Sequence, residues 1–189
     1  GSQPTMSLRT MMPQHNVNHP YIKLPIDIHK TSQMRRLPLY TYSDGPVLSR
    51  KILDLIKNDP DITNNLRIFY EPYGVGALNF DTHNKKPNKD YIFNRIGAVF
   101  KDNPQTYVNK DEYQLPLAGI FEASPFSNKP LIIDIMKHAG ATSKQEAEDY
   151  FKQYLKTLLD GQLGIYLKYG LSLEVHQQNT HVVFGKDGK

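Results

Sequence analysis

Four polar side chains with the chemistry to bind a ligand lie in a segment with recurring apolar residues near the end of this 189-residue sequence. The segment covers residues 171–184, is rich in Leu, Val and Phe, and contains Glu174, His176, Gln178 and Asn179. Alternate residues of a strand share a face, so Glu174, His176 and Gln178 would lie together. An acid, an imidazole and an amide can hold a ligand, and no serine or threonine in a nucleophile elbow accompanies them. The pattern favours ligand binding over nucleophilic catalysis.

The same residues admit a structural interpretation. A polar group buried without a partner costs about 1–3 kcal/mol, so these side chains either form a satisfied network in the core or line a site. His176 and His181 are an odd number of residues apart and would face opposite sides of a strand. The segment therefore predicts an internal network or a ligand site, and argues against a metal site built from both histidines.

A second candidate group lies near the N-terminus. Ser7, Arg9 and Thr10 could bind an anion through a guanidinium fork and two hydroxyl groups, although a solvated loop would have the same composition. The chain carries 23 basic and 19 acidic residues, a net charge of +4, and its basic residues are scattered. This distribution does not indicate nucleic-acid binding, and it fits a pocket for a small anion better.

A long helix must position the 171–184 segment. Ser143 and Glu146 have the spacing of a capping box, and apolar residues then recur at intervals of three and four. Gly170 is suited to the C-terminal cap. These features predict a helix over 143–169 that leads directly into a buried strand over 171–184.

Elsewhere the sequence predicts an α+β fold, with mainly antiparallel sheet elements in the N-terminal part and helices plus the buried strand in the C-terminal part. We expect strands over 21–30, 66–72 and 74–80, helices over 47–58 and 131–138, and an element of either type over 92–100. Gly74-Val75-Gly76 resembles the beginning of a phosphate loop but lacks the third glycine and the following helix, so we interpret it as a turn or bulge. The polar residues 81–90 divide a β-rich portion, 1–80, from a second portion, 81–189.

Several classes of protein are excluded by composition. The chain has no cysteine, which excludes disulfides, thiolate metal sites and a cysteine nucleophile. No apolar run approaches the roughly 20 residues of a membrane span, and the N-terminus lacks the features of a signal peptide. We therefore expect a cytoplasmic protein with no membrane or nucleic-acid partner.

Three motifs together resemble the IucA/IucC family, the synthetases that build siderophores without a nonribosomal peptide synthetase. The C-terminal segment resembles the central family motif through Tyr169-Gly170, Leu173-Glu174, His176 and Gln178-Asn179. Ser7-Leu8-Arg9-Thr10 resembles the Ser-x-Arg-Thr loop, and Lys23-Leu24 with Thr31-Ser32-Gln33-Met34-Arg35 resembles the Lys-Leu strand and the Thr-Ser-x-x-Arg segment. The three motifs occur in the order of the family and cover most of the chain.

The resemblance implies ATP-dependent condensation of a carboxylic acid, often citrate or a derivative, with an amine or alcohol through an acyl-adenylate. It also implies Mg²⁺, a bacterial origin and a β-rich "fingers" portion before a helical "palm". The triphosphate contacts that it implies are Ser7, Arg9, Thr10, Lys23 and Arg35. It assigns His176, Gln178 and Asn179 to the nucleotide and Glu174 to the metal, with His176 and Arg9 as the catalytic candidates. From residue types alone, Lys23 and Arg35 would be ordinary surface charges.

The sequence also departs from the family pattern. It ends at Lys189, before the Arg-Asp-containing segment that follows the central motif in the family, and it lacks the N-terminal domain. We therefore expect an internal fragment with little or no catalytic activity, and a possible homodimer. The alternative functions are a non-catalytic nucleotide- or carboxylate-binding module and a purely structural core network.

Overall fold

The computed structural model describes residues 1–7, 9–14, 16, 18–30, 33–34, 36–77, 80–81, 86–87 and 95–189. It forms two compact units: unit 1 comprises Gly1–Lys57 and Ile68–Thr106, and unit 2 comprises Asn58–Arg67 and Tyr107–Lys189. Antiparallel strand pairs and separate helices confirm the predicted α+β class. The boundaries between these two units differ from the boundary expected after residue 80. The assignment of the two portions as fingers and palm stays a prediction.

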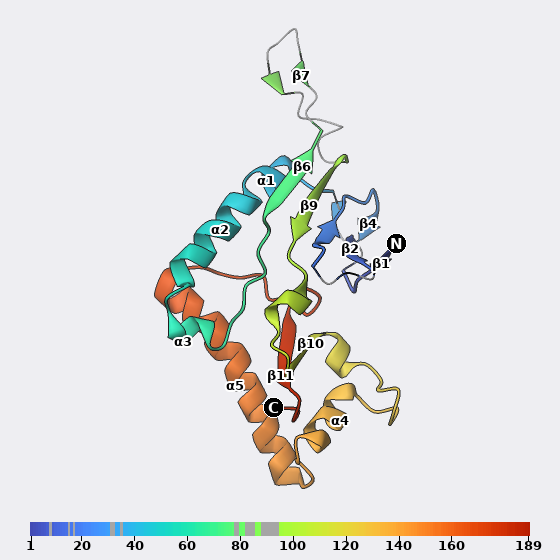
Figure 1. Ribbon diagram of the computed structural model, residues 1–189, viewed down its shortest axis with the longest axis vertical. Helices are drawn as coiled ribbons and strands as arrows, with labels where there is room; N and C mark the ends of the chain where they lie inside the picture. Colours follow the sequence, from blue (N-terminus) through green and yellow to red (C-terminus); the bar gives the residue numbers. More distant parts are fainter. Residues whose placement is uncertain are drawn as a thin grey trace. The chain divides into compact units, whose positions relative to one another are not determined.

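Unit 1 is built on an antiparallel sheet with the strand order β1-β2-β3-β9-β6 (Figure 1). Its strands are β1 Ser2–Pro4, β2 Thr10–Pro13, β3 Tyr21–Lys23, β6 Tyr73–Gly76 and β9 Gly97–Lys101. Short strand pairs are β4 His29–Lys30 with β5 Gln33–Met34, and β7 Phe80–Asp81 with β8 Lys86–Pro87. The helical segments are α1 Leu39–Ser43, α2 Gly45–Ile56 and the 3-10 turn Pro104–Tyr107, whose last residue belongs to unit 2.

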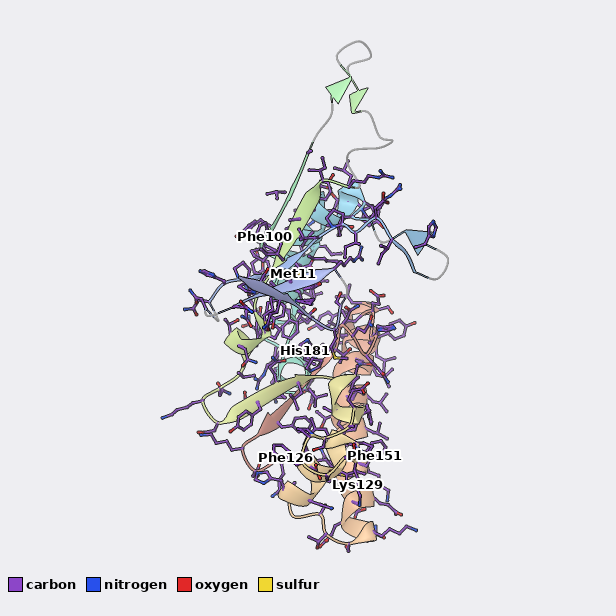
Figure 2. The ribbon with its side chains drawn as sticks, turned by 90° about the vertical axis from the view of Figure 1, so that its right-hand side faces the viewer. Met11, Phe100, Phe126, Lys129, Phe151 and His181 are labelled. Carbon is purple, nitrogen blue, oxygen red and sulfur yellow. The ribbon has the colours of Figure 1, made fainter. Side chains whose placement is uncertain are left out.

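The strand register separates the two faces of this sheet. One row of directly paired residues is Met11, Ile22, Phe100 and Tyr73, of which Figure 2 labels Met11 and Phe100. The adjacent row, on the opposite face, is Thr10, Lys23, Val99 and Gly74. Val99 is buried with Leu37 and Tyr42 in the core of this unit. The face that carries this second row is therefore apolar at β6 and β9, and polar at β3 and β2, where Lys23 and Thr10 lie.

Unit 2 consists mainly of a hairpin and a long helix. The strands β10 Glu112–Pro116 and β11 His181–Gly185 pair antiparallel, and α5 Lys144–Tyr169 runs alongside β11 (Figure 1). The shorter helical segments are α3 Pro60–Thr63, the 3-10 turn η2 Gly119–Phe121 and α4 Leu131–His138. Tyr150 and Tyr154 of α5 pack on a core that contains Ile120, Ile132 and Phe184. In the described part of the chain, every helix is too short or too polar for a transmembrane segment.

The helix predictions with strong local signals are confirmed. The capping box forms: the Ser143 side chain accepts a bond from the Glu146 backbone N–H at 3.3 Å, and the Glu146 carboxylate accepts one from the Ser143 N–H at 2.8 Å. Gly170 has a φ of 66°, the left-handed conformation that ends the helix. The expected helices over 47–58 and 131–138 correspond to α2 and α4.

The strand predictions are less accurate. Residues 66–72 contain no strand, and the expected strand over 21–30 is regular only in β3 and β4. The expected strand over 74–80 is observed as β6 up to Gly76. Of the expected element over 92–100, the described part from Gly97 onward is the strand β9. A strand requires a partner to complete its hydrogen bonds, and sequence alternation does not identify that partner.

A bidentate ion pair joins two parts of unit 2. Arg67 donates to Glu112 Oε2 at 2.7 Å and Oε1 at 2.9 Å, and it also donates to the Tyr107 carbonyl oxygen at 2.5 Å. The hydrogen bonds from Arg67, and then that from the Asn109 N–H, lower the pKa of Glu112 to about 2. The ion pair therefore stabilises unit 2 fully at pH values above the ordinary pKa of a glutamate. This contribution is lost as the pH falls towards about 2.

Glu112→Gln is expected to lower the free energy of unfolding by about 1 kcal/mol at pH 7, since solvent partly screens the pair. The deficit should shrink as the pH falls from 4.5 towards 2, because Glu112 of the unfolded wild-type chain takes up a proton in this range while the folded carboxylate stays ionised until about pH 2. Urea unfolding at pH 7 and pH 3 measures both effects. The exposed Glu122→Gln provides the control, and an undiminished deficit at acid pH would contradict the expectation.

Candidate functional site

The predicted anion-binding residues of unit 1 lie together at one end of β2 and β3. The Thr10 hydroxyl donates to Ser7 Oγ at 3.2 Å, and the Thr10 N–H donates to the Ser7 carbonyl at 3.0 Å. Thr10 is paired with Lys23 across the strands, and the Leu24 N–H donates to the Arg9 carbonyl at 2.7 Å. A tight turn and two strands thus place these residues at one end of β2 and β3, with the two hydroxyl groups in contact, and the four candidates Ser7, Arg9, Thr10 and Lys23 are all half-buried.

The Arg9 guanidinium is oriented by the backbone. Its Nη1 donates to the carbonyl oxygen of Arg36 at 2.8 Å. Asp27 contacts the guanidinium groups of Arg36 and Arg95 at 3.1 and 3.0 Å. The bond to the Arg36 carbonyl fixes the direction of the Arg9 side chain without neutralising its charge, which is a useful property in a group that binds an anion.

Lys101 is a cationic residue that the sequence interpretation missed. It lies at the end of β9, paired with Tyr21, and therefore on the same sheet face as Lys23. Its ammonium group lies 5.0 Å from the ring centroid of Phe69. Desolvation lowers the pKa of Lys101, Glu71 opposes this effect, and the charge of Lys23 adds to it. In the sequence, Lys101 begins a Lys-Asp-Asn-Pro stretch typical of a strand end, and its apolar neighbour Phe69 is distant in the chain.

Arg35, the remaining triphosphate candidate, lies outside the described residues. The other four candidates lie at one end of β2 and β3, and their two hydroxyls and two cations are groups that can bind a polyanion. Such a site could hold phosphate or carboxylate oxygens and offset charge that develops on them during a reaction.

The expected buried strand over 171–184 is wrong for most of its length. Residues 171–180 contain no strand, and β11 begins only at His181. Glu174 and His176 are exposed, so their polar groups do not incur the desolvation cost that a buried strand would impose. The cause is local: the His176 carbonyl accepts bonds from the N–H groups of Asn179 and Thr180, which form a turn instead of a strand ladder.

This turn brings His176, Gln178 and Asn179 together without strand alternation. The Asn179 N–H lies 2.8 Å from the His176 carbonyl oxygen, and the Gln178 N–H donates to His176 Nδ1 at 3.2 Å. Because Nδ1 accepts this bond, the proton of the neutral ring is on Nε2. The exposed imidazole is therefore held as a hydrogen-bond donor at Nε2, a suitable group for a phosphate or nucleotide oxygen.

Glu174 precedes the turn and is exposed. Among the residues that the structure describes, no group of three or more His, Asp or Glu side chains could hold a metal ion. Mg²⁺ is commonly bound through one or two carboxylates together with substrate phosphates and water, and Glu174 can fill that role. His181 has a different environment, because its Nδ1 bonds to Gln114 Oε1 of β10 (Figure 2).

Comparison with known proteins shows the family to which this chain belongs. The family model described as "IucA / IucC family" matches residues 1–122. The chain belongs to the IucA/IucC family. A second model, "Ferric iron reductase FhuF-like transporter", matches residues 148–189, which comprise most of α5 and the rest of the chain, including β11.

Relatives of this IucA/IucC chain include synthetases and ligases. D-ornithine–citrate ligase of Staphylococcus aureus is 27% identical over 191 residues, covering 97% of this chain and 28% of the ligase. Petrobactin biosynthesis protein AsbB of Bacillus anthracis has the same fold, with a TM-score of 0.81 and 19% identity over 98% of this chain and 29% of AsbB. ATP-bound aerobactin synthetase IucA of Klebsiella pneumoniae has a TM-score of 0.75 and 20% identity over 98% of this chain and 32% of that protein. The chain thus spans about 30% of the length of these three proteins.

Proposed function

We propose that this chain is the ATP-binding part of a siderophore synthetase. The protein would activate a citrate-like carboxylic acid and condense it with an amine or an alcohol. The observation that carries the proposal is the assembly of Ser7, Arg9, Thr10 and Lys23 at one end of two strands, in a chain of the IucA/IucC family. The ATP-bound state of a structural neighbour supports the choice of nucleotide.

The proposed reaction has two steps. A carboxylate oxygen of the acid bonds to the α-phosphorus of ATP, the bond from that phosphorus to the bridging oxygen breaks, and pyrophosphate leaves. The amine or alcohol then adds to the acyl carbon and AMP leaves, while the nucleophile loses its proton. Both steps require cationic and hydrogen-bonding groups that stabilise negative charge on phosphate oxygens.

The residues divide between these tasks. Ser7, Arg9, Thr10 and Lys23 would hold the triphosphate, together with Arg35. Lys101, on the same sheet face as Lys23, would add positive charge. His176 would donate from Nε2 and, with Gln178 and Asn179, would contact the nucleotide; Glu174 would bind Mg²⁺, which shields the triphosphate charge. His176 and Arg9 are the catalytic residues of the proposal, and a homodimer stays a prediction.

Calorimetric titration of Mg–ATP into the 189-residue chain tests the proposal. We expect saturable binding with a Kd below about 1 mM, in the range typical of enzyme substrates. Circular dichroism would establish that the titrated protein is folded. A folded chain that takes up no Mg–ATP at millimolar concentration would overturn ATP binding by this part of the protein.

A further inference from the structure

A buried carboxylate joins the short helix α3 to the last turn of α5. Asp59 is only 7% exposed, and its Oδ2 accepts hydrogen bonds from the Tyr169 hydroxyl at 2.5 Å and from the Lys168 ammonium group at 2.7 Å. Its Oδ1 accepts a bond from the Asp61 N–H at 3.2 Å and caps α3. The bonds from Lys168 and then Tyr169 lower the pKa of Asp59, so the carboxylate is charged at neutral pH.

The short helix α3 lies beside α5 (Figure 1), and two glycines of α5 permit this close approach. A Cβ at Gly161 would lie 3.1 Å from the Asn65 carbonyl oxygen, and one at Gly164 would lie 2.9 Å from Ile62 Cδ1. Each glycine inside a helix costs about 1 kcal/mol relative to alanine. Ile62 is 1% exposed, so the α3 segment is packed closely against α5 where these glycines occur.

The anchored helix end leads directly to the candidate nucleotide turn. Gly170 follows Tyr169 in the left-handed conformation, and the irregular segment 171–180 follows Gly170. At its far end the segment is fixed by bonds from the Leu117 N–H to the Thr180 carbonyl at 2.8 Å and from the Ala118 N–H to the Gln177 carbonyl at 3.2 Å. Both ends of the segment are therefore fixed, one of them by the Asp59 cluster.

We propose that Asp59 and Tyr169 are positioning residues for the His176 turn. The Tyr169–Asp59 hydrogen bond fixes where the chain leaves α5, and the 171–180 segment then presents His176, Gln178 and Asn179 to the nucleotide. This inference rests on the proposed ATP-binding function. A purely structural contact between α3 and α5 would stabilise unit 2 without influencing the turn in particular.

Tyr150 supplies a matched control on the same helix. Its hydroxyl donates to the Gly188 carbonyl oxygen at 2.5 Å, so Tyr150→Phe and Tyr169→Phe each remove one partly buried tyrosine hydrogen bond from α5. We expect Tyr169→Phe to weaken Mg–ATP binding about tenfold, the usual effect of losing a group that orients a ligand-binding residue. Tyr150→Phe should leave the affinity unchanged. Asp59→Asn retains an oxygen acceptor for Tyr169 but loses the charge, and its affinity should lie between those of Tyr169→Phe and the wild type.

Amide hydrogen exchange separates this inference from the proposed function. Exchange over 171–180 should be about tenfold faster in Tyr169→Phe than in the wild type, and unchanged in Tyr150→Phe. If the wild type fails to bind Mg–ATP but this exchange difference is present, the ATP proposal fails and the anchoring of the turn stands. If the wild type binds Mg–ATP and both tyrosine variants bind equally well, the positioning role is overturned.

Discussion

Arg9→Ala is expected to weaken Mg–ATP binding at least about 30-fold, since a hydrogen bond to a charged group contributes about 2 kcal/mol. The guanidinium is held in place by the Arg36 carbonyl at 2.8 Å, so its positive charge is oriented before the ligand arrives. A preorganised cation loses less conformational entropy on binding than a mobile one. Calorimetric titration at fixed ionic strength measures the effect.

Two further variants show whether the charge of Arg9 or the geometry of its guanidinium group determines the affinity for Mg–ATP. Arg9→Lys retains the charge but lacks the planar fork, so its affinity should lie between those of the wild type and Arg9→Ala. Arg50→Ala removes another arginine of unit 1, whose guanidinium donates to the Tyr70 hydroxyl at 2.7 Å, and should leave the affinity unchanged. Equal losses in Arg50→Ala and Arg9→Ala would show that Arg9 contributes only general positive charge.

The elements that the sequence predicts correctly are those with local signals. The helix α5 is specified by a capping box, an apolar stripe and a left-handed glycine, all within one continuous stretch. The grouping of Ser7, Arg9 and Thr10 is likewise local, because these residues belong to one turn. Their proximity could therefore be inferred without knowing the fold, whereas anion binding by them stays a prediction.

The sequence fails where distant residues or turn hydrogen bonds decide the structure. The alternating apolar residues of 171–180 resemble a strand, but hydrogen bonds to the His176 carbonyl and ring make a turn instead. Asp59 and Tyr169 are 110 residues apart, so no local pattern reveals their bond. The desolvation of Lys101 likewise depends on how the sheet of unit 1 is assembled.

Gly74-Val75-Gly76 illustrates how the same residues can suggest two different roles. The two glycines resemble part of a phosphate loop, and the predicted turn or bulge is wrong, because both lie within β6 in regular pairing with β9 and face Tyr42 of α1. A Cβ at Gly74 would lie 2.5 Å from Tyr42 Cβ and 2.6 Å from the Tyr42 carbonyl oxygen. The missing side chain therefore allows a helix to approach the sheet, and phosphate binding is not needed to explain the motif.

Gly74→Ala is accordingly expected to destabilise unit 1 by about 3 kcal/mol, because the new methyl group overlaps backbone atoms that cannot rotate away. Tyr42 is buried in the core with Leu37 and Val99, so a shift of α1 would disturb that whole cluster. Urea unfolding measures the loss. Gly45→Ala is the matched control, since its Cβ would meet Glu71 Oε2 at an ordinary 3.5 Å at the start of a helix.

The two interpretations of the motif predict opposite results for this variant. If the glycines serve packing, Gly74→Ala lowers the unfolding free energy, and the protein that remains folded at low temperature binds Mg–ATP with wild-type affinity. If they form a phosphate loop, stability is retained and affinity falls, because the added methyl group would keep phosphate away from the backbone. We expect the first result, since the close approach of Tyr42 already accounts for the absence of a side chain at Gly74.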